Sequence, residues 1–175
     1  APSGAKLGAI DWPAPDRVAE GEVMTYAYKN EVLLPVVATM AAPGQFRVHA
    51  NWLICREICV PEEADFVLDL PSGTAAPNAQ APLFAGHATR VPRDIGVRAT
   101  FAPDGVLAVR GIGGATSAWF VPDAPGAIVD AAPQPFRASE DGFELRLKRA
   151  DPTKPVATLT GVIAAFGADG KRTDA

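Results

Sequence analysis

Two cysteines that stand four positions apart are the residues of this sequence best suited to chemistry. Cys55 and Cys59 lie in the stretch NWLICREICVPEE, residues 51–63. Two thiols at this spacing can form a structural disulfide, act as a redox-active pair, stay free in a core or supply half of a metal site. The segments on either side of the cysteines have to position them for one of these roles.

The spacing limits how the two cysteines can pair with each other. A disulfide needs Cα atoms about 4.4–6.8 Å apart, whereas four residues of extended strand separate them by about 13 Å. If Cys55 and Cys59 pair, we therefore expect the preceding strand to end at Ile54. The chain then has to turn tightly through residues 56–58, and Pro61 would set the direction in which it leaves the turn.

A disulfide between these positions would stabilise the fold only weakly. Closing so short a loop restricts the unfolded chain by only about 2 kcal/mol, before any strain in the native state is subtracted. Strained and exposed disulfides are also more readily reduced than structural ones, which suits electron exchange. The sequence therefore favours a redox-active pair over an inert bridge, and an inert bridge over two free thiols.

Metal binding is the remaining interpretation. Two thiolates supply half of a tetrahedral site, and the soft or borderline ligands elsewhere in the chain are His49, His87, Met24 and Met40. Cys-x-x-x-Cys with one distant histidine is a ligand set of copper-delivering proteins, which makes His87 the candidate third ligand. A lone histidine is, however, more often a solvated side chain than a ligand.

The segments around the cysteines have the pattern of β structure. Apolar and polar residues alternate from Phe46 to Ile54, as expected for a half-buried strand. Other short segments are separated by turns rich in Pro (17 residues) and Gly (16 residues), and long helix-period patterns are absent. The further predicted elements are strands at 23–28, 31–40, 65–70, 117–121, 142–149 and 156–166, a hairpin at 95–112, a turn at Lys29-Asn30 and one helical turn within 83–89. We therefore predict an all-β fold of sandwich type.

A segment without periodicity divides the chain. Residues 71–82, PSGTAAPNAQAP, have the Pro, Gly, Ser and Ala composition that is typical of a linker. We predict a cysteine-bearing β domain at 1–72, a linker at 73–83 and a second β-sandwich-like subdomain at 84–175. One continuous β-region with a flexible seam in the linker fits the same pattern.

Composition and motifs argue against several partners and cofactors. Sixteen Lys and Arg against twenty Asp and Glu give a net charge of −4 without a basic run, so nucleic acid is not an expected partner. The longest apolar run, 32–42, is interrupted by Pro35 and is shorter than the roughly 20 residues that span a bilayer, so we expect no direct membrane insertion. GIGGAT at 111–116 lacks the third glycine of a dinucleotide fingerprint.

The polar tail after Gly167 is expected to fray.

The order of several motifs resembles one known family. YKNEVLLPV at 28–36, then an alternating strand, then C-x-x-x-C-V-P-E at 55–62 and LDLP at 68–71 together resemble the periplasmic N-terminal domain of DsbD-type thiol:disulfide interchange proteins. WPAP at 12–15 and the three-residue cysteine spacing are similar to the ScsB-like, suppressor-of-copper-sensitivity branch. The resemblance covers about residues 10–72.

The resemblance implies an immunoglobulin-like β domain in the periplasm, attached to the transmembrane electron-transfer domain of an inner-membrane protein. Such a domain passes reducing equivalents to thioredoxin-like partner proteins and needs no cofactor. Carried over by position, Cys59 matches the cysteine that forms the mixed disulfide, and Cys55 matches its resolving mate. Residues 17–24 match the loop that covers the cysteines in DsbD, and Tyr28 matches a tyrosine ahead of the LPV strand.

This sequence differs from the best-known DsbD domains in two ways. Those domains have five residues between their cysteines, so the assignment of nucleophile and mate stays open here. They also have more chain before the cysteines than the 54 residues present, so we expect that this chain either lacks the opening strands or is a fragment, which would leave its first sheet incomplete. Close to the pair, we expect Ile58 and Val60 to form an apolar wall, with Trp52 and Ile54 packed in the core.

Two alternative functions remain open at this point. The first is a copper-handling module that uses Cys55, Cys59 and His87 as ligands. The second is a non-catalytic β-sandwich interaction domain in which the bridge is merely structural. The main hypothesis is a protein-disulfide reductase domain whose catalytic residues are Cys55 and Cys59.

Overall fold

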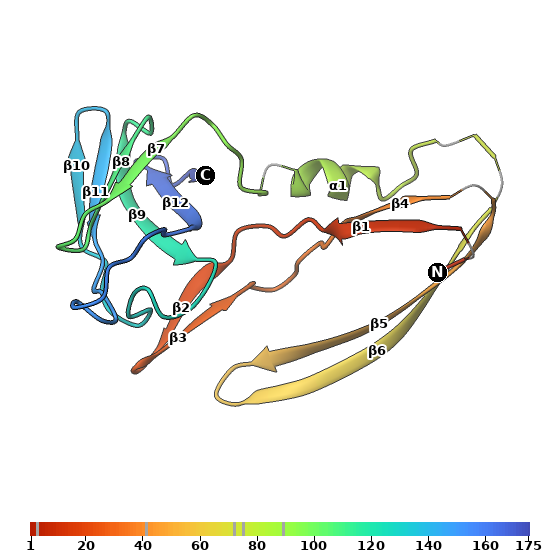
Figure 1. Ribbon diagram of the computed structural model, residues 1–175. Coiled ribbons are helices and arrows are strands. Elements are labelled where there is room, and N and C mark those ends of the chain that lie inside the picture. Colours follow the sequence, from red (N-terminus) through yellow and green to blue (C-terminus); the bar gives the residue numbers. More distant parts are fainter. Residues whose placement is uncertain (3, 41, 72, 75, 89) are drawn as a thin grey trace. The chain divides into compact units, whose positions relative to one another are not determined.

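Alternating apolar and polar segments, separated by proline and glycine turns, fold this chain into short β-strands with one short helix (Figure 1). The structure is a computed structural model that describes residues 1–2, 4–40, 42–71, 73–74, 76–88 and 90–175. In chain order the elements are β1 (Lys6–Ile10), β2 (Asp16–Glu20), β3 (Val23–Ala27), β4 (Val36–Thr39), β5 (Gly44–Cys55), β6 (Cys59–Leu70), α1 (Ala81–His87), β7 (Arg98–Phe101), β8 (Val106–Arg110), β9 (Ala115–Pro122), β10 (Phe136–Ser139), β11 (Gly142–Arg146), β12 (Gly161–Gly167) and β13 (Arg172–Asp174). The predicted all-β class is confirmed. No helix among the described residues has the length and hydropathy of a membrane span.

The elements are grouped into two compact units. The first unit contains Ala1–Asp11 and Leu34–Pro82, and the second contains Trp12–Leu33 and Leu83–Ala175. The chain therefore passes from one unit to the other three times, after residues 11, 33 and 82. β2 and β3, which precede the cysteines by about 30 residues in the sequence, belong to the second unit. The predicted domain limits, with a linker at 73–83, stay a prediction.

The second unit contains a β-sandwich with a packed core. One sheet has the order β10-β11-β8-β7 and the other has the order β13-β12-β9. Every second residue of β8 and β11 faces the core, where Val109, Phe143 and Leu145 are fully buried. The buried cluster consists of Leu107, Val109, Ile112, Ala115, Ala118, Phe120, Ile128, Phe143, Leu145, Leu147, Ile163 and Ala165. Each large side chain buried in this way stabilises the fold by about 1.5–3 kcal/mol.

The C-terminal tail forms a strand, so the prediction that it frays was wrong. β13 pairs with β12, and the backbones of Ile163 and Ala175 exchange two hydrogen bonds of 2.8 and 3.0 Å. Arg172 gives the physical reason, because its Nε donates to Asp174 Oδ1 at 2.6 Å and its Nη1 to Asp16 Oδ1 at 2.8 Å. The polar residues of the tail are thus bound by charged partners within the second unit.

The first unit is built from two separate strand pairs. β1 pairs with β4, and β5 pairs with β6 in a long hairpin (Figure 1). The predicted turn residue Asn30 does have a positive φ of 64°, but the strands around it are not partners, since β3 pairs with β2. Among the described residues of this unit, only Phe46 is buried. The first unit therefore has strand pairing without a core of its own.

The disulfide hairpin as candidate functional site

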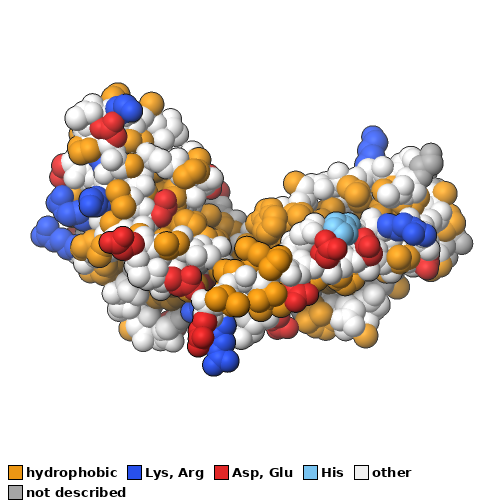
Figure 2. All heavy atoms as spheres, turned by 90° about the horizontal axis from the view of Figure 1, so that it is seen from below, with side chains coloured by type: hydrophobic (Ala, Val, Ile, Leu, Met, Phe, Trp, Pro, Cys, Tyr) orange, Lys and Arg blue, Asp and Glu red, His pale blue; other side chains and the backbone are white. Residues whose placement is uncertain are grey.

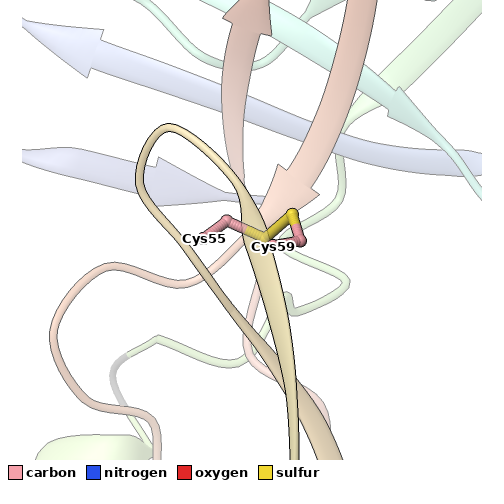
Figure 3. Close-up of a disulfide and its surroundings, with 2 residues drawn as sticks. All are labelled: Cys55 and Cys59. Atoms are coloured by element: carbon pink, nitrogen blue, oxygen red, sulfur yellow. A yellow bond between two sulfur atoms is a disulfide. The ribbon is translucent and has the colours of Figure 1, made fainter.

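The register of the β5–β6 hairpin places the two cysteines directly opposite each other. Twelve residue pairs run from Gly44 opposite Leu70 to Cys55 opposite Cys59. The two Sγ atoms are 2.05 Å apart and the two Cα atoms 4.0 Å apart, so the cysteines form a disulfide across the end of the hairpin (Figure 3). Residues 56–58 make the turn, and the Arg56 N–H donates to the Ile58 carbonyl at 3.2 Å.

The predicted turn at 56–58 is confirmed, but the strand boundaries around it were misplaced. β5 continues through Cys55 and does not stop at Ile54, because directly opposed residues of an antiparallel pair are close enough to bridge. The distance between two residues along one strand does not limit a bridge between two paired strands. Pro61 lies inside β6, opposite Leu53, and does not mark the exit from the turn.

The disulfide lies at an exposed end of the hairpin. Both cysteines and all three turn residues are exposed, and Ile58 is 75% exposed. The expectation that Trp52 and Ile54 pack in the core was wrong, since they are 40% and 57% exposed. Thiol–disulfide exchange requires that an attacking sulfur can reach the bridge, and this position permits it.

The two faces of the hairpin differ in chemistry. Paired residues point to the same side of a two-stranded sheet, and successive pairs alternate between sides. On the side of the bridge, which we call the disulfide face, the next pairs are Leu53 with Pro61, Asn51 with Glu63, and His49 with Asp65. On the opposite side, which we call the apolar face, the pairs are Ile54 with Val60, Trp52 with Glu62, Ala50 with Ala64, Val48 with Phe66, and Phe46 with Leu68. The predicted alternation of β5 is therefore correct, and Val60 lies on the apolar face beside Ile54.

A hollow lies next to the bridge along the hairpin. It has a volume of about 510 Å³ and is lined by Asn51, Trp52, Leu53, Pro61, Glu62 and Glu63. These are three successive pairs of the register, and the first of them is two residues from the cysteines. Further along the disulfide face, His49 Nδ1 is 2.9 Å from Asp65 Oδ1, and His49 Nε2 is 3.9 Å from Glu63 Oε2. The surroundings of the bridge thus combine apolar surface with carboxylates.

The candidate metal ligands are not gathered into a site in the described part of the chain. No group of three or more His, Cys, Asp or Glu side chains is placed there to hold a metal ion. Cys55 and Cys59 are bonded to each other, and His49 contacts Asp65. His87 is buried at the end of α1, in the second unit. The copper hypothesis would need Cys55 and Cys59 in their reduced form.

A second group of polar residues, which the sequence did not point to, holds β2 and β3 in the second unit. Tyr26 Oη donates to Asp130 Oδ1 at 2.7 Å, and Arg17 Nη2 donates to the Asp130 carbonyl at 2.7 Å. Burial, together with the nearby Asp130 carboxylate, raises the pKa of Tyr26 to about 12. Residues 17–24, which the resemblance matches to a covering loop, thus form part of an anchored hairpin. Their role in covering the cysteines stays a prediction.

Arg172 also belongs to the group of polar residues that holds β2 and β3 in the second unit. Its guanidinium lies over the rings of Trp119 and Phe166, at 5.8 and 5.9 Å from their centroids. Besides its two carboxylate partners, Arg172 donates from Nη2 to the Pro15 carbonyl at 2.9 Å. Burial raises the pKa of the Asp174 carboxyl, although Arg172 acts in the opposite direction. No local signal could have identified this contact, because 156 residues separate Arg172 from Asp16.

Comparison with known proteins identifies the cysteine-bearing part of the chain. Residues 1–71 match the family model described as thiol:disulfide interchange protein DsbD, N-terminal. No curated protein and no solved structure gives a significant match. The family match does not separate the ScsB-like branch from others, so that placement stays a prediction. The segment that carries both cysteines, residues 1–71, is thus similar to the DsbD N-terminal domain family.

Proposed function

We propose that this protein is a periplasmic thiol–disulfide exchange module and that Cys55 and Cys59 are its catalytic residues. The observation that carries the proposal is the exposed disulfide at the end of the hairpin, within a segment that matches a thiol:disulfide interchange family. Twelve residue pairs already hold β5 and β6 together, and the bridge closes a loop of only three intervening residues. A disulfide in this position restricts the unfolded chain little, so electron exchange explains it better than stability does.

The proposed reaction transfers two electrons from the reduced pair to a partner protein. The Cys59 thiolate attacks one sulfur of the partner's disulfide, that S–S bond breaks, and the second partner sulfur leaves as a thiolate that takes up a proton. The Cys55 thiolate then attacks Cys59 Sγ in the mixed disulfide. This step forms the Cys55–Cys59 bridge and releases the partner as a dithiol. The order of the two cysteines follows the resemblance to DsbD-type domains.

The proposed partners follow from the same resemblance. Thioredoxin-like proteins would accept the electrons, and the transmembrane electron-transfer domain of a parent inner-membrane protein would reduce the bridge again. The exposed turn carries both Arg56, which favours a neighbouring thiolate, and Glu57, which opposes one. No cofactor enters this reaction, since both half-reactions exchange a dithiol for a disulfide.

The reduction potential of the Cys55–Cys59 couple tests the proposal. The protein is equilibrated in a series of glutathione or dithiothreitol redox buffers, and its free thiols are trapped and counted. We expect a midpoint in the range of about −120 to −270 mV that is found for exchange-active proteins. A midpoint below about −300 mV, with slow reduction, would instead identify a structural bridge and overturn the proposal.

A further inference from the structure

The hollow lies beside the bridge, within reach of a chain that is joined to either cysteine. In the mixed disulfide, the partner's cysteine is joined to the end of the hairpin on the disulfide face. Leu53 and Pro61 lie on this same face, two residues from the cysteines, and both line the hollow. An extended chain advances about 3.3 Å per residue, so partner side chains two or three residues from the reactive cysteine reach this distance.

The hollow offers apolar surface for the partner. Leu53 is 64% exposed, and Trp52 and Pro61 are also exposed. Exposed hydrophobic side chains are widespread on the surface of the protein (Figure 2). The apolar stem of a long side chain could therefore lie along Leu53 and Pro61 while its polar end reaches beyond them.

The polar end of such a side chain would meet negative charge. Glu62 and Glu63 line the hollow and are exposed. Within the described part of the chain, Glu62 makes no ion pair, and the only basic side chain within 4 Å of a Glu63 carboxylate oxygen is the imidazole of His49, at 3.9 Å. Asp65, the next acidic residue on the disulfide face, adds to the same field. The charge of this region is thus complementary to a cation.

We propose that the hollow is a specificity site for an Arg or Lys side chain of the partner protein, two or three residues from its reactive cysteine. The stem of that side chain packs on Leu53 and Pro61, and its cationic end pairs with Glu63, which lies on the same face. This inference rests on the proposed exchange reaction, because the hollow meets the partner only when a mixed disulfide forms. The site accelerates attack on partners of this kind and slows attack on partners with an acidic residue at the same place.

Three matched peptides test this specificity. Each contains a single cysteine, activated as a mixed disulfide with 5-thio-2-nitrobenzoate, and residues on both sides of that cysteine at a distance of two are Arg, Gln or Glu. When the reduced protein attacks the peptide cysteine, the coloured thiolate leaves, and its absorbance gives the second-order rate constant. We expect the Arg peptide to react about three- to fivefold faster than the Gln peptide at low salt, as for one exposed ion pair. The difference should disappear in 1 M salt, where the screening length is about 3 Å.

Two variants locate the effect. Glu63→Gln should reduce the ratio of the Arg to the Gln rate constant to about one. Asp69→Asn, which removes the same charge from the far end of the disulfide face, should leave this ratio unchanged. An unchanged ratio in Glu63→Gln, or equal rates for all three peptides with the unaltered protein, would overturn the specificity site. If no peptide releases the coloured thiolate, the exchange reaction itself is wrong, so the two failures are distinguishable.

Discussion

The two units use the same strand pattern for opposite purposes. Along β8 and β11, alternating apolar residues face a second sheet and are buried, and Phe143 is 0% exposed. Along β5 and β6, alternation is as regular, yet Phe66 is 55% exposed and Phe46 is the only buried residue in the described part of its unit. The comparison indicates that stability is concentrated in the second unit, whereas the exposed bridge lies on a hairpin with little core.

Removing the bridge should have the largest effect on activity and only a small effect on stability. Cys59→Ser should abolish reduction of a partner disulfide to a dithiol, because the remaining Cys55 thiol has no second thiol with which to close the bridge and release the partner. The free energy of unfolding should fall by no more than about 2 kcal/mol, since the closed loop is short. A partner-reduction assay and urea unfolding measure the two effects. A large loss of stability with partner binding intact would support the structural interpretation of the bridge.

Truncating a phenylalanine in each unit tests where the stability lies. Phe143→Ala removes a fully buried ring whose centroid is 5.3 Å from that of the Phe136 ring. The substitution should lower the free energy of unfolding by about 3–5 kcal/mol. Phe66→Ala removes an exposed ring and should change it by less than about 0.5 kcal/mol. Urea unfolding of the two variants gives the comparison. Equal losses would show that the hairpin is buried against other surfaces in solution.

The anchor of β2 and β3 is the next feature to break. Arg172→Met removes the partner of Asp16 and leaves the half-buried Asp174 unpaired. The free energy of unfolding should therefore fall by about 2–3 kcal/mol. Residues 12–33 should also become more susceptible to limited proteolysis. Lys171→Met, at an exposed neighbouring position, serves as the control and should behave like the unaltered protein. Unchanged proteolysis of residues 12–33 in Arg172→Met would show that Arg172 does not hold the hairpin.

A smaller effect is expected at high pH. The pKa of Tyr26 is raised to about 12 in the folded protein, above its ordinary value of 10.0, so folding favours the protonated phenol. The stabilisation is fully present below pH 10 and is lost as the pH rises towards 12. Tyr26→Phe should therefore show a shallower decrease in melting temperature across this range. Equal slopes for both proteins would contradict the role assigned to the Tyr26–Asp130 hydrogen bond.

The sequence predicted features that depend on neighbouring residues. The turn between β7 and β8 is one of them, because Asp-Gly favours it and Gly105 has φ +88° there. A Cβ atom at Gly105 would also lie 2.3 Å from the Leu147 carbonyl oxygen, so only glycine fits. The turn between the cysteines, residues 56–58, was predictable for a similar reason, since two cysteines that are close in sequence can bridge only across a turn.

The sequence did not predict features that depend on distant partners. Alternation in β5 identified an apolar face correctly, but it carries no information on whether another layer covers that face, so Trp52 and Ile54 were wrongly placed in a core. The turn signal at Asn30 likewise does not tell which strands pair, since β3 pairs with β2 and not with the strand after Asn30. The cysteines of the candidate site could be singled out from the sequence, whereas the hollow depends on the cross-strand register of three residue pairs.

The three passages of the chain between the units have a consequence for cutting and rejoining the protein. A single proteolytic nick within residues 76–82 interrupts only the last of the three passages and leaves those after residues 11 and 33 intact. The N-terminal fragment would still contain β2 and β3, which Asp130 and Arg172 of the other fragment bind. The two fragments should therefore remain a non-covalent complex after the nick, and separately produced fragments should be able to complement each other.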